Sequence, residues 1–317
     1  MIKSVDLIKT FGSKTVLGPI SMDLEDRGIL GLLGPDGAGK TTLLRIICGI
    51  MDPSSGSLAV DGIDIKKDPE SVKQKIGYMP QKFSLYGDLT VMENMLFYAD
   101  LYLVPAKKRD RTIERLLKFS NLTPFMDRRA ENLSGGMKQK LGLSCAMIHR
   151  PQILILDEPT NGVDPLSRQE FWEILKELKE EGVFIIISTP YMDEAERCDS
   201  IILINKGSLL YHGSPAAFKK KHLGHIADIS TSDNRKAAGI FNADPLVLAV
   251  NDYGQTLHLN CSRSFPIDNI GKILEAYDIK VTGIKRVDPG IEDVFIYMVN
   301  TLTGADRNIP PGFNNSK

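Results

Sequence analysis

Apolar and polar residues alternate over the first two dozen positions of the chain, and continuous apolar runs follow. The segments 4–12 (SVDLIKTFG) and 20–26 (ISMDLED) alternate in the way half-buried antiparallel strands do. Residues 29–34 (ILGLLG) form an apolar run that stops at a glycine, and residues 41–51 (TTLLRIICGIM) carry apolar side chains at helical spacing. The pattern therefore predicts half-buried strands, then a buried strand, a glycine-rich loop and a helix.

The middle of the chain is largely helical, and two buried strands follow it. Residues 88–149 show helical periodicity. The runs at 153–159 (ILILDEP) and 183–189 (VFIIIST) are short and rich in β-branched residues, as central strands buried on both faces are. Between them, residues 168–182 form an amphipathic helix that ends at a glycine. Buried strands that alternate with helices indicate an α/β fold.

Beyond residue 224 the pattern starts again, in the order strand, helix, strand, strand, helix, strand. This order suggests a small ferredoxin-like α+β domain. The end of the chain is polar and rich in turn-forming residues, which is typical of disorder. We therefore expect a first domain over residues 1–222, an accessory domain over 223–302 and a disordered tail over 303–317.

Composition narrows the function classes. The chain has 317 residues and a net charge of −1, so it lacks the basic excess of a nucleic-acid-binding protein. Its four cysteines lie far apart without a CxxC pair, which favours free thiols in a reducing compartment. No apolar run reaches the about 18–20 residues that span a bilayer, and residues 1–12 lack the apolar core of a signal peptide. Any membrane role would then come through a partner.

The strongest chemical signal is GPDGAGKT at 34–41, which fits G-x-x-x-x-G-K-[ST] between a predicted strand and a predicted helix. Glycines let successive backbone N–H groups face inward, and the helix N-terminus adds positive partial charge. Lys40 can reach the β- and γ-phosphates of a nucleotide, and Thr41 can place its hydroxyl on Mg²⁺.

Two carboxylates follow a buried strand at 153–158 (ILILDE). Asp157 at the tip of this strand can hold Mg²⁺, and Glu158 can accept a proton from an attacking water. By itself such a strand supports a nucleotide-hydrolysing site only moderately. Together with the phosphate-binding loop at 34–41, called the phosphate loop below, it supports such a site strongly.

A third segment, LSGGMKQ at 133–139, places Ser134, Gly135 and Gly136 at a predicted helix N-terminus, which is another anion site. Two such sites on one subunit become useful when two subunits dimerise head to tail and each encloses the other's ATP. The alternative interpretation is an ordinary helix cap.

In this order the three motifs resemble those of the nucleotide-binding subunit of ATP-binding cassette (ABC) transporters, over about residues 2–215. The details YGDLTVMEN, STPYMDEAERCD and IEDVF resemble the bacterial ABC-2 export branch, which includes drug-efflux exporters. The resemblance implies a P-loop NTPase fold with a RecA-like core, an antiparallel β subdomain and a helical subdomain. It also implies an ATPase that couples ATP hydrolysis to transport.

Further site residues follow from the resemblance, position by position. Phe11 matches the aromatic residue that stacks on adenine, Gln81 in GYMPQ matches the glutamine that touches Mg²⁺ or the lytic water, and Asp164 matches the aspartate at the dimer interface. The alternatives are a core position for Phe11 and an ordinary surface position for Gln81. The expected catalytic residues are Glu158, Lys40 and Gln81, the expected Mg²⁺ ligands are Thr41, Gln81 and Asp157, and the expected ATP-contacting residues are Phe11, Gly34, Pro35, Asp36, Gly37, Ala38, Gly39, Lys40, Thr41, Thr42, Ser134, Gly135, Gly136 and Asp164.

The same resemblance implies partners and a place in the cell. We expect a second ATP-binding subunit, identical or different, and a separate ABC-2 type permease. We expect no nucleic-acid partner, and a peripheral location on the cytoplasmic face of the inner membrane. A soluble ABC protein that acts on ribosomes or DNA is a rival, but such proteins usually fuse two cassettes or carry a long coiled coil, and this chain has neither.

The pattern departs from the family at Pro190. The family usually has a histidine after the strand that follows the Asp-Glu pair, and this histidine contacts the γ-phosphate. Proline offers neither a side-chain donor nor a backbone N–H. Two interpretations stay open: a slower but active site that relies on Glu158, or the degenerate half of a heterodimer that binds ATP and hydrolyses it poorly. A nucleotide-sensing regulatory subunit is a related alternative.

Overall fold

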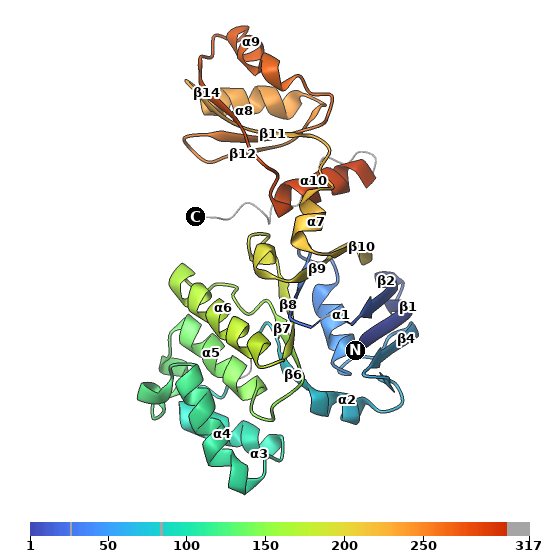
Figure 1. The fold of residues 1–317 in the computed structure, drawn as a ribbon, viewed down its shortest axis with the longest axis vertical. Coiled ribbons are helices and arrows are strands. Elements are labelled where there is room, and N and C mark those ends of the chain that lie inside the picture. Colours follow the sequence, from blue (N-terminus) through green and yellow to red (C-terminus); the bar gives the residue numbers. More distant parts are fainter. Residues whose placement is uncertain (26, 83–84, 303–317) are drawn as a thin grey trace. The chain divides into compact units, whose positions relative to one another are not determined.

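The computed structural model describes residues 1–25, 27–82 and 85–302, and the chain divides into two compact units (Figure 1). The first unit is Met1–His212, and the second begins at Gly213. Helix α7 (Pro215–Lys219) packs against α10 (Ile291–Leu302) and belongs to the second unit. The division after His212 therefore comes ten residues earlier than the boundary expected after residue 222. The tail expected over 303–317 lies outside the described residues.

The first unit contains two sheets. The antiparallel sheet has the strand order β2-β1-β4-β5, and the second sheet has the order β10-β9-β3-β8-β7-β6. The strands of the first sheet are β1 (Ile2–Phe11), β2 (Lys14–Leu24), β4 (Ser55–Val60) and β5 (Ile63–Asp64). The strands of the second are β3 (Ile29–Leu33), β6 (Ile76–Met79), β7 (Ile153–Asp157), β8 (Phe184–Thr189), β9 (Ser200–Asn205) and β10 (Ser208–Gly213). In this second sheet β3, β6, β7, β8 and β9 run parallel.

The sequence pattern explains which strands lie in the middle. Every residue of β3, β7 and β8 is buried, as the continuous apolar runs predict for central parallel strands. On β7 the side chains alternate between two buried faces, so Ile153 and Ile155 join one core cluster while Leu154 and Leu156 are buried on the other face. The alternating segments form β1 and β2, which confirms their prediction as antiparallel strands.

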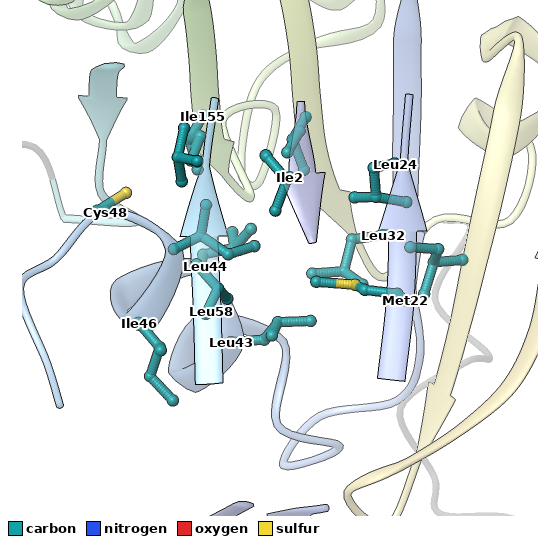
Figure 2. Packing of buried hydrophobic residues seen from close by; sticks show 14 of the residues in the cluster. Ile2, Met22, Leu24, Leu32, Leu43, Leu44, Ile46, Cys48, Leu58 and Ile155 are labelled. Atoms are coloured by element: carbon teal, nitrogen blue, oxygen red, sulfur yellow. The ribbon is translucent and has the colours of Figure 1, made fainter. Parts of the chain in front are cut away.

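The main core lies where the antiparallel sheet, helix α1 (Lys40–Ile47) and one face of the six-stranded sheet meet. Figure 2 shows Leu43 and Leu44 of α1 among apolar side chains from β1, β2, β3, β4 and β7. Leu44 is fully buried, and the whole cluster fixes α1 directly behind the end of β3. The phosphate loop predicted between β3 and α1 is therefore held at both ends by packed elements.

Helices cover the rest of the first unit. Helix α5 (Gly135–Ala146) packs against β6 and against α6 (Pro165–Glu180), which in turn packs on β8. Helices α3 (Val91–Leu101) and α4 (Ala106–Phe119) lie side by side and form the predicted helical region (Figure 1). The short helix α2 (Pro69–Lys75) precedes β6. Thr90 begins α3 with a capping box, in which its hydroxyl accepts from the Glu93 N–H and its own N–H donates to the Glu93 carboxylate.

The second unit has its own sheet and its own core. Its elements are β11 (His225–Thr231), α8 (Asn234–Ala243), β12 (Val247–Asp252), β13 (Leu257–Cys261), α9 (Ile270–Glu275), β14 (Val281–Arg286) and α10. This confirms the predicted order of strands and helices, and the strands pair antiparallel in the order β12-β13-β11-β14. A separate apolar cluster joins α8 and α9 to the sheet, with Phe241 and Leu259 fully buried.

A charged clamp fastens α10 to this sheet. The two ring nitrogens of His258 on β13 lie 2.8 Å from an Asp228 oxygen and 3.0 Å from an Asp293 oxygen at the start of α10. Only a protonated imidazole can donate to both carboxylates at once. The hydrogen bond to Asp293 first, and then the bond to Asp228, raise the pKa of His258 to about 8.

This clamp predicts how the stability of the second unit depends on pH. The folded-state pKa of His258 lies above its usual 6.5, so its contribution is fully present below about 6.5 and is lost as the pH rises through about 8. We expect the thermal midpoint of the second unit to fall between about pH 6 and about pH 9, measured by calorimetry on the full chain. His258→Gln should lower this midpoint at the acid end and flatten its pH dependence. The same change at exposed His212→Gln is the control, and an unchanged pH profile in His258→Gln would contradict the assignment.

Candidate functional site

The loop between β3 and α1 has a backbone that requires glycine at two positions. Gly39, the N-cap of α1, has φ +107°, and a Cβ there would lie 2.5 Å from Leu17 Cδ2. Gly34 has φ +156°, and a Cβ there would lie 2.2 Å from the Ile204 carbonyl oxygen. The loop therefore curls against β2 and β9, and it delivers the chain into α1 without an acidic residue in the first turn. This is the arrangement that favours an anion at the helix N-terminus.

Lys40 turns back over this loop and is almost wholly buried, with 4 % of its surface exposed. Its ammonium donates to the Gly34 carbonyl at 2.8 Å and to the Pro35 carbonyl at 3.2 Å. The same nitrogen lies 3.3 Å from Glu158 Oε1. Lys40 thus joins the loop after β3 to the end of β7 through a buried ion pair. Removing one partner of such a pair strongly destabilises the folded protein, because the other charge is left buried and unpaired.

Glu158 is the point at which three segments meet. It directly follows β7, adopts φ +50°, and is 7 % exposed. The Gln81 side-chain amide donates to Glu158 Oε2 at 2.7 Å, which brings together two residues that are 77 positions apart. The Glu158 N–H donates to the Ser188 hydroxyl oxygen at 3.0 Å. Two of the predicted catalytic residues, Lys40 and Gln81, therefore both contact the third, Glu158.

Asp157 has one satisfied and one unsatisfied carboxylate oxygen. The Ser188 hydroxyl donates to Oδ1 at 2.6 Å, whereas Oδ2 is buried and has no hydrogen-bond partner among the described residues. A buried carboxylate oxygen without a partner is unfavourable. A hard cation that prefers oxygen ligands would satisfy it, so the residue fits a divalent metal ion bound beside the phosphate loop.

The segment 134–136 begins helix α5. Ser134 is its N-cap, and the Ser134 hydroxyl accepts from the Met137 N–H at 3.3 Å. A Cβ on Gly136 would lie 2.4 Å from Ser167 Oγ on α6, so a glycine is needed for the close packing of α5 on α6. Within the described part of the chain no hydrogen bond or ion pair joins this segment to Lys40, Asp157 or Glu158, and its anion site stays a prediction.

The remaining predicted residues differ in their exposure to solvent. Phe11 is 49 % exposed, so it is not a core residue, and the Lys9 ammonium lies 5.1 Å from the centroid of its ring. Asp164 is the exposed N-cap of α6, and its carboxylate accepts from the Ser167 N–H at 2.9 Å. The hydrogen bonds from Ser167 hold the pKa of Asp164 below its usual value. Asp36 and Gly37 are exposed, Thr41 and Thr42 are partly exposed, and Pro35 and Ala38 are buried.

Sequence reasoning missed Ser188, which binds both predicted carboxylate residues from the neighbouring strand. In the sequence the only signal is a serine that follows the apolar residues of this strand. It also missed a group of contacts after β8, where the Arg168 guanidinium lies 4.3 Å from the centroid of the Tyr191 ring and Glu194 is fully buried. Pro190, at the position where the family histidine was expected, directly precedes Tyr191.

None of the described helices combines the length and the apolar character that a bilayer crossing requires. This finding is limited to residues 1–25, 27–82 and 85–302.

Comparison with known proteins agrees with the site. The family model for ABC transporters matches residues 17–161. The chain is 42% identical over 300 residues to the probable multidrug ABC transporter ATP-binding protein YbhF of Escherichia coli (strain K12), which covers 94% of this chain and 51% of that protein. The chain thus spans about half the length of this relative.

Two further proteins match most of their own length. Nod factor export ATP-binding protein I of Rhizobium sp. (strain N33) is 34% identical over 305 residues, covering 94% of this chain and 95% of that protein. The dimeric structure of the ATP-binding cassette MJ0796, in a post-hydrolysis state bound to ADP and Pi, superposes with a TM-score of 0.61 at 25% identity and covers 68% of this chain and 98% of that chain. These matches and the phosphate-loop site agree, and the chain belongs to the ABC transporter family, among its ATP-binding subunits.

Proposed function

We propose that this chain binds MgATP at the loop of residues 34–42, hydrolyses it, and uses the cycle to drive export through a separate ABC-2 type permease. The observation that carries the proposal is that both Lys40 and Gln81 contact Glu158 at the end of β7, where the preceding residue, Asp157, has an unsatisfied oxygen. A mere nucleotide-binding loop does not need a buried carboxylate at this point. A hydrolase does, because the attacking water has to lose a proton.

Different residues would bind the phosphates, the adenine and the Mg²⁺ ion. The backbone of residues 34–42 and the N-terminus of α1 would hold the phosphates, and the exposed ring of Phe11 would stack on adenine. Thr41, Gln81 and Asp157 would hold Mg²⁺, which when bound supplies positive charge against the phosphate oxygens. With so few protein ligands, the oxygens of the nucleotide would complete the coordination of this Mg²⁺.

Lys40 and Glu158 would exchange partners during the cycle. Lys40 now neutralises Glu158, and a phosphate oxygen would take over its ammonium when ATP binds. Glu158 would then be free to accept the proton of the attacking water, with the Gln81 amide orienting the carboxylate. Ser188 keeps the Glu158 backbone in place through both of its oxygens, at 3.0 and 3.1 Å.

Partners of this subunit follow from the same reasoning. Ser134, Gly135, Gly136 and Asp164 would contact the ATP held by a second ATP-binding subunit, which the dimer of the similar cassette MJ0796 supports. The similarity to the probable multidrug transporter protein YbhF and to Nod factor export ATP-binding protein I supports an export role, and the cargo would be chosen by the permease. We place the subunit at the cytoplasmic face of the inner membrane, bound to the permease. Residues 223–302 would form a ferredoxin-like accessory domain.

Pro190 favours a second candidate: the poorly hydrolysing half of a heterodimeric transporter. Removing one charge-stabilising contact from a transition state lowers the rate by roughly 10²–10³. Lys40, Gln81, Asp157 and Glu158 are nevertheless assembled in one place, and this supports an active site of reduced speed.

Glu158→Gln tests the proposed hydrolysis directly. We expect steady-state MgATP turnover to fall by about 10² or more, because the amide cannot accept the proton, while ATP binding is retained. Turnover of the unchanged chain should rise more than linearly with protein concentration, because two subunits complete each site. Glu173→Gln, which removes a surface pair with Lys176, is the matched control and should keep full activity. Equal turnover in Glu158→Gln and the unchanged chain would refute this role.

Pro190→His tests whether the missing histidine limits the rate. We expect turnover to rise by about tenfold or more, since one donor to the γ-phosphate is restored. Pro190→Ala is the control, because it removes the ring without adding a side-chain donor. If both variants raise turnover equally, backbone freedom rather than the donor is limiting, and the assignment of position 190 is wrong.

A further inference from the structure

Two loops of the first unit meet beside the catalytic carboxylate. One follows β7 and runs from Glu158 to Asp164, and the other follows β8 and runs from Pro190 to Arg197. Between them lies Arg168 in the early part of α6. The residues of the first loop include Glu158, so anything that fixes this loop also fixes the carboxylate.

Arg168 binds both a ring and a buried carboxylate of the second loop. Its guanidinium lies 4.3 Å from the centroid of the Tyr191 ring, within the range of a cation–π interaction. Its Nε lies 3.7 Å from Glu194 Oε1, and Glu194 is completely buried. A buried carboxylate requires a compensating charge, and Arg168 supplies it.

The second loop in turn holds the first at two consecutive positions. The Thr160 hydroxyl donates to Glu194 Oε1 at 2.8 Å, and this bond is buried. The Tyr191 hydroxyl donates to Asn161 Oδ1 at 3.4 Å. The Asn161 N–H donates to the Glu158 carbonyl at 3.2 Å, so the contact continues to the catalytic residue itself.

Glu158 needs such support because its backbone is strained. Its φ of +50° is unfavourable for a residue with a side chain, and such conformations persist only where surrounding contacts impose them. Pro190 has no side-chain donor with which to attach the loop after β8. The attachment therefore falls to the residue after it, Tyr191.

We propose that Arg168 and Tyr191 are positioning residues for ATP hydrolysis: together with Glu194 they tie the loop after β8 to residues 160–161 and so hold Glu158 in the backbone conformation that places its carboxylate beside Gln81. The kinetic part of this inference rests on the proposed role of Glu158 in hydrolysis. The tie between the two loops does not.

The first test measures kcat and KM for MgATP in four variants. Arg168→Gln and Tyr191→Leu should each lower kcat by about tenfold with KM changed less than about twofold, because a displaced carboxylate slows the reaction without weakening nucleotide binding. Tyr191→Phe keeps the ring under the guanidinium but removes the donor to Asn161, so it should lower kcat less than Tyr191→Leu does. The double variant Arg168→Gln/Tyr191→Leu should fall no further than the worse single variant, because both act through one tie.

A matched control lies in the same loop. The Arg197 guanidinium also lies over an aromatic ring, 5.7 Å from the centroid of Trp172, but this ring belongs to α6 and to neither of the two loops. Arg197→Gln should leave kcat unchanged. Unchanged kcat in Tyr191→Leu, additive losses in the double variant, or an equal loss in Arg197→Gln would each overturn the proposal.

The second test does not require turnover. Amide hydrogen exchange of the peptide covering residues 157–164 should be faster in Arg168→Gln and Tyr191→Leu than in the unchanged chain, and unaltered in Arg197→Gln. Faster exchange in a chain that shows no turnover would mean that the tie exists while the proposed hydrolysis is wrong. Identical exchange in all variants would mean that Arg168 and Tyr191 do not position this loop.

Discussion

Two opposite charges, those of Lys40 and Glu158, lie buried against each other where the strands of the parallel sheet end. With 4 % and 7 % of their surfaces exposed, each is a buried charged group that needs its partner and further polar contacts. The loop carbonyls of Gly34 and Pro35 complete the shell of Lys40, and the amide of Gln81 completes that of Glu158. Because a phosphate can replace Glu158 as the partner of Lys40, the pair is both a structural contact and the element that a nucleotide would rearrange.

The position of β8 between β3 and β7 makes this arrangement possible. Parallel strands end at the same edge, so the phosphate loop after β3 and the two carboxylates after β7 face one another across one strand width. Ser188 on the intervening strand β8 contacts both carboxylate residues, since its hydroxyl donates to Asp157 and accepts from the Glu158 N–H. Two adjacent carboxylates thereby receive different surroundings: Asp157 keeps one free oxygen, while Glu158 is fully engaged.

The second unit is stabilised by contacts of its own. All of the predicted site residues lie before residue 165, and the second unit has its own apolar cluster. Its polar network also involves different chemistry, because Asn260 donates to the Asp293 carbonyl and His258 bridges Asp293 to Asp228. The unit is therefore stabilised independently of nucleotide contacts, by a helix that is fastened to a sheet through charged groups.

The sequence by itself determined the local features. Continuous apolar runs predicted β3, β7 and β8, and the glycines of residues 34–39 predicted the loop. The local patterns after residue 224 predicted the order of strands and helices in the second unit. Each of these features depends on neighbours within a few positions of the sequence. Only the tertiary structure decided that β8 lies between β3 and β7, that Gln81 reaches Glu158, that Ser188 binds both carboxylates, and that Arg168 contacts Tyr191 and Glu194. These contacts join segments up to many tens of residues apart. They follow from how the two faces of the sheet are covered and from the need to pair every buried charge, and no local pattern records either requirement.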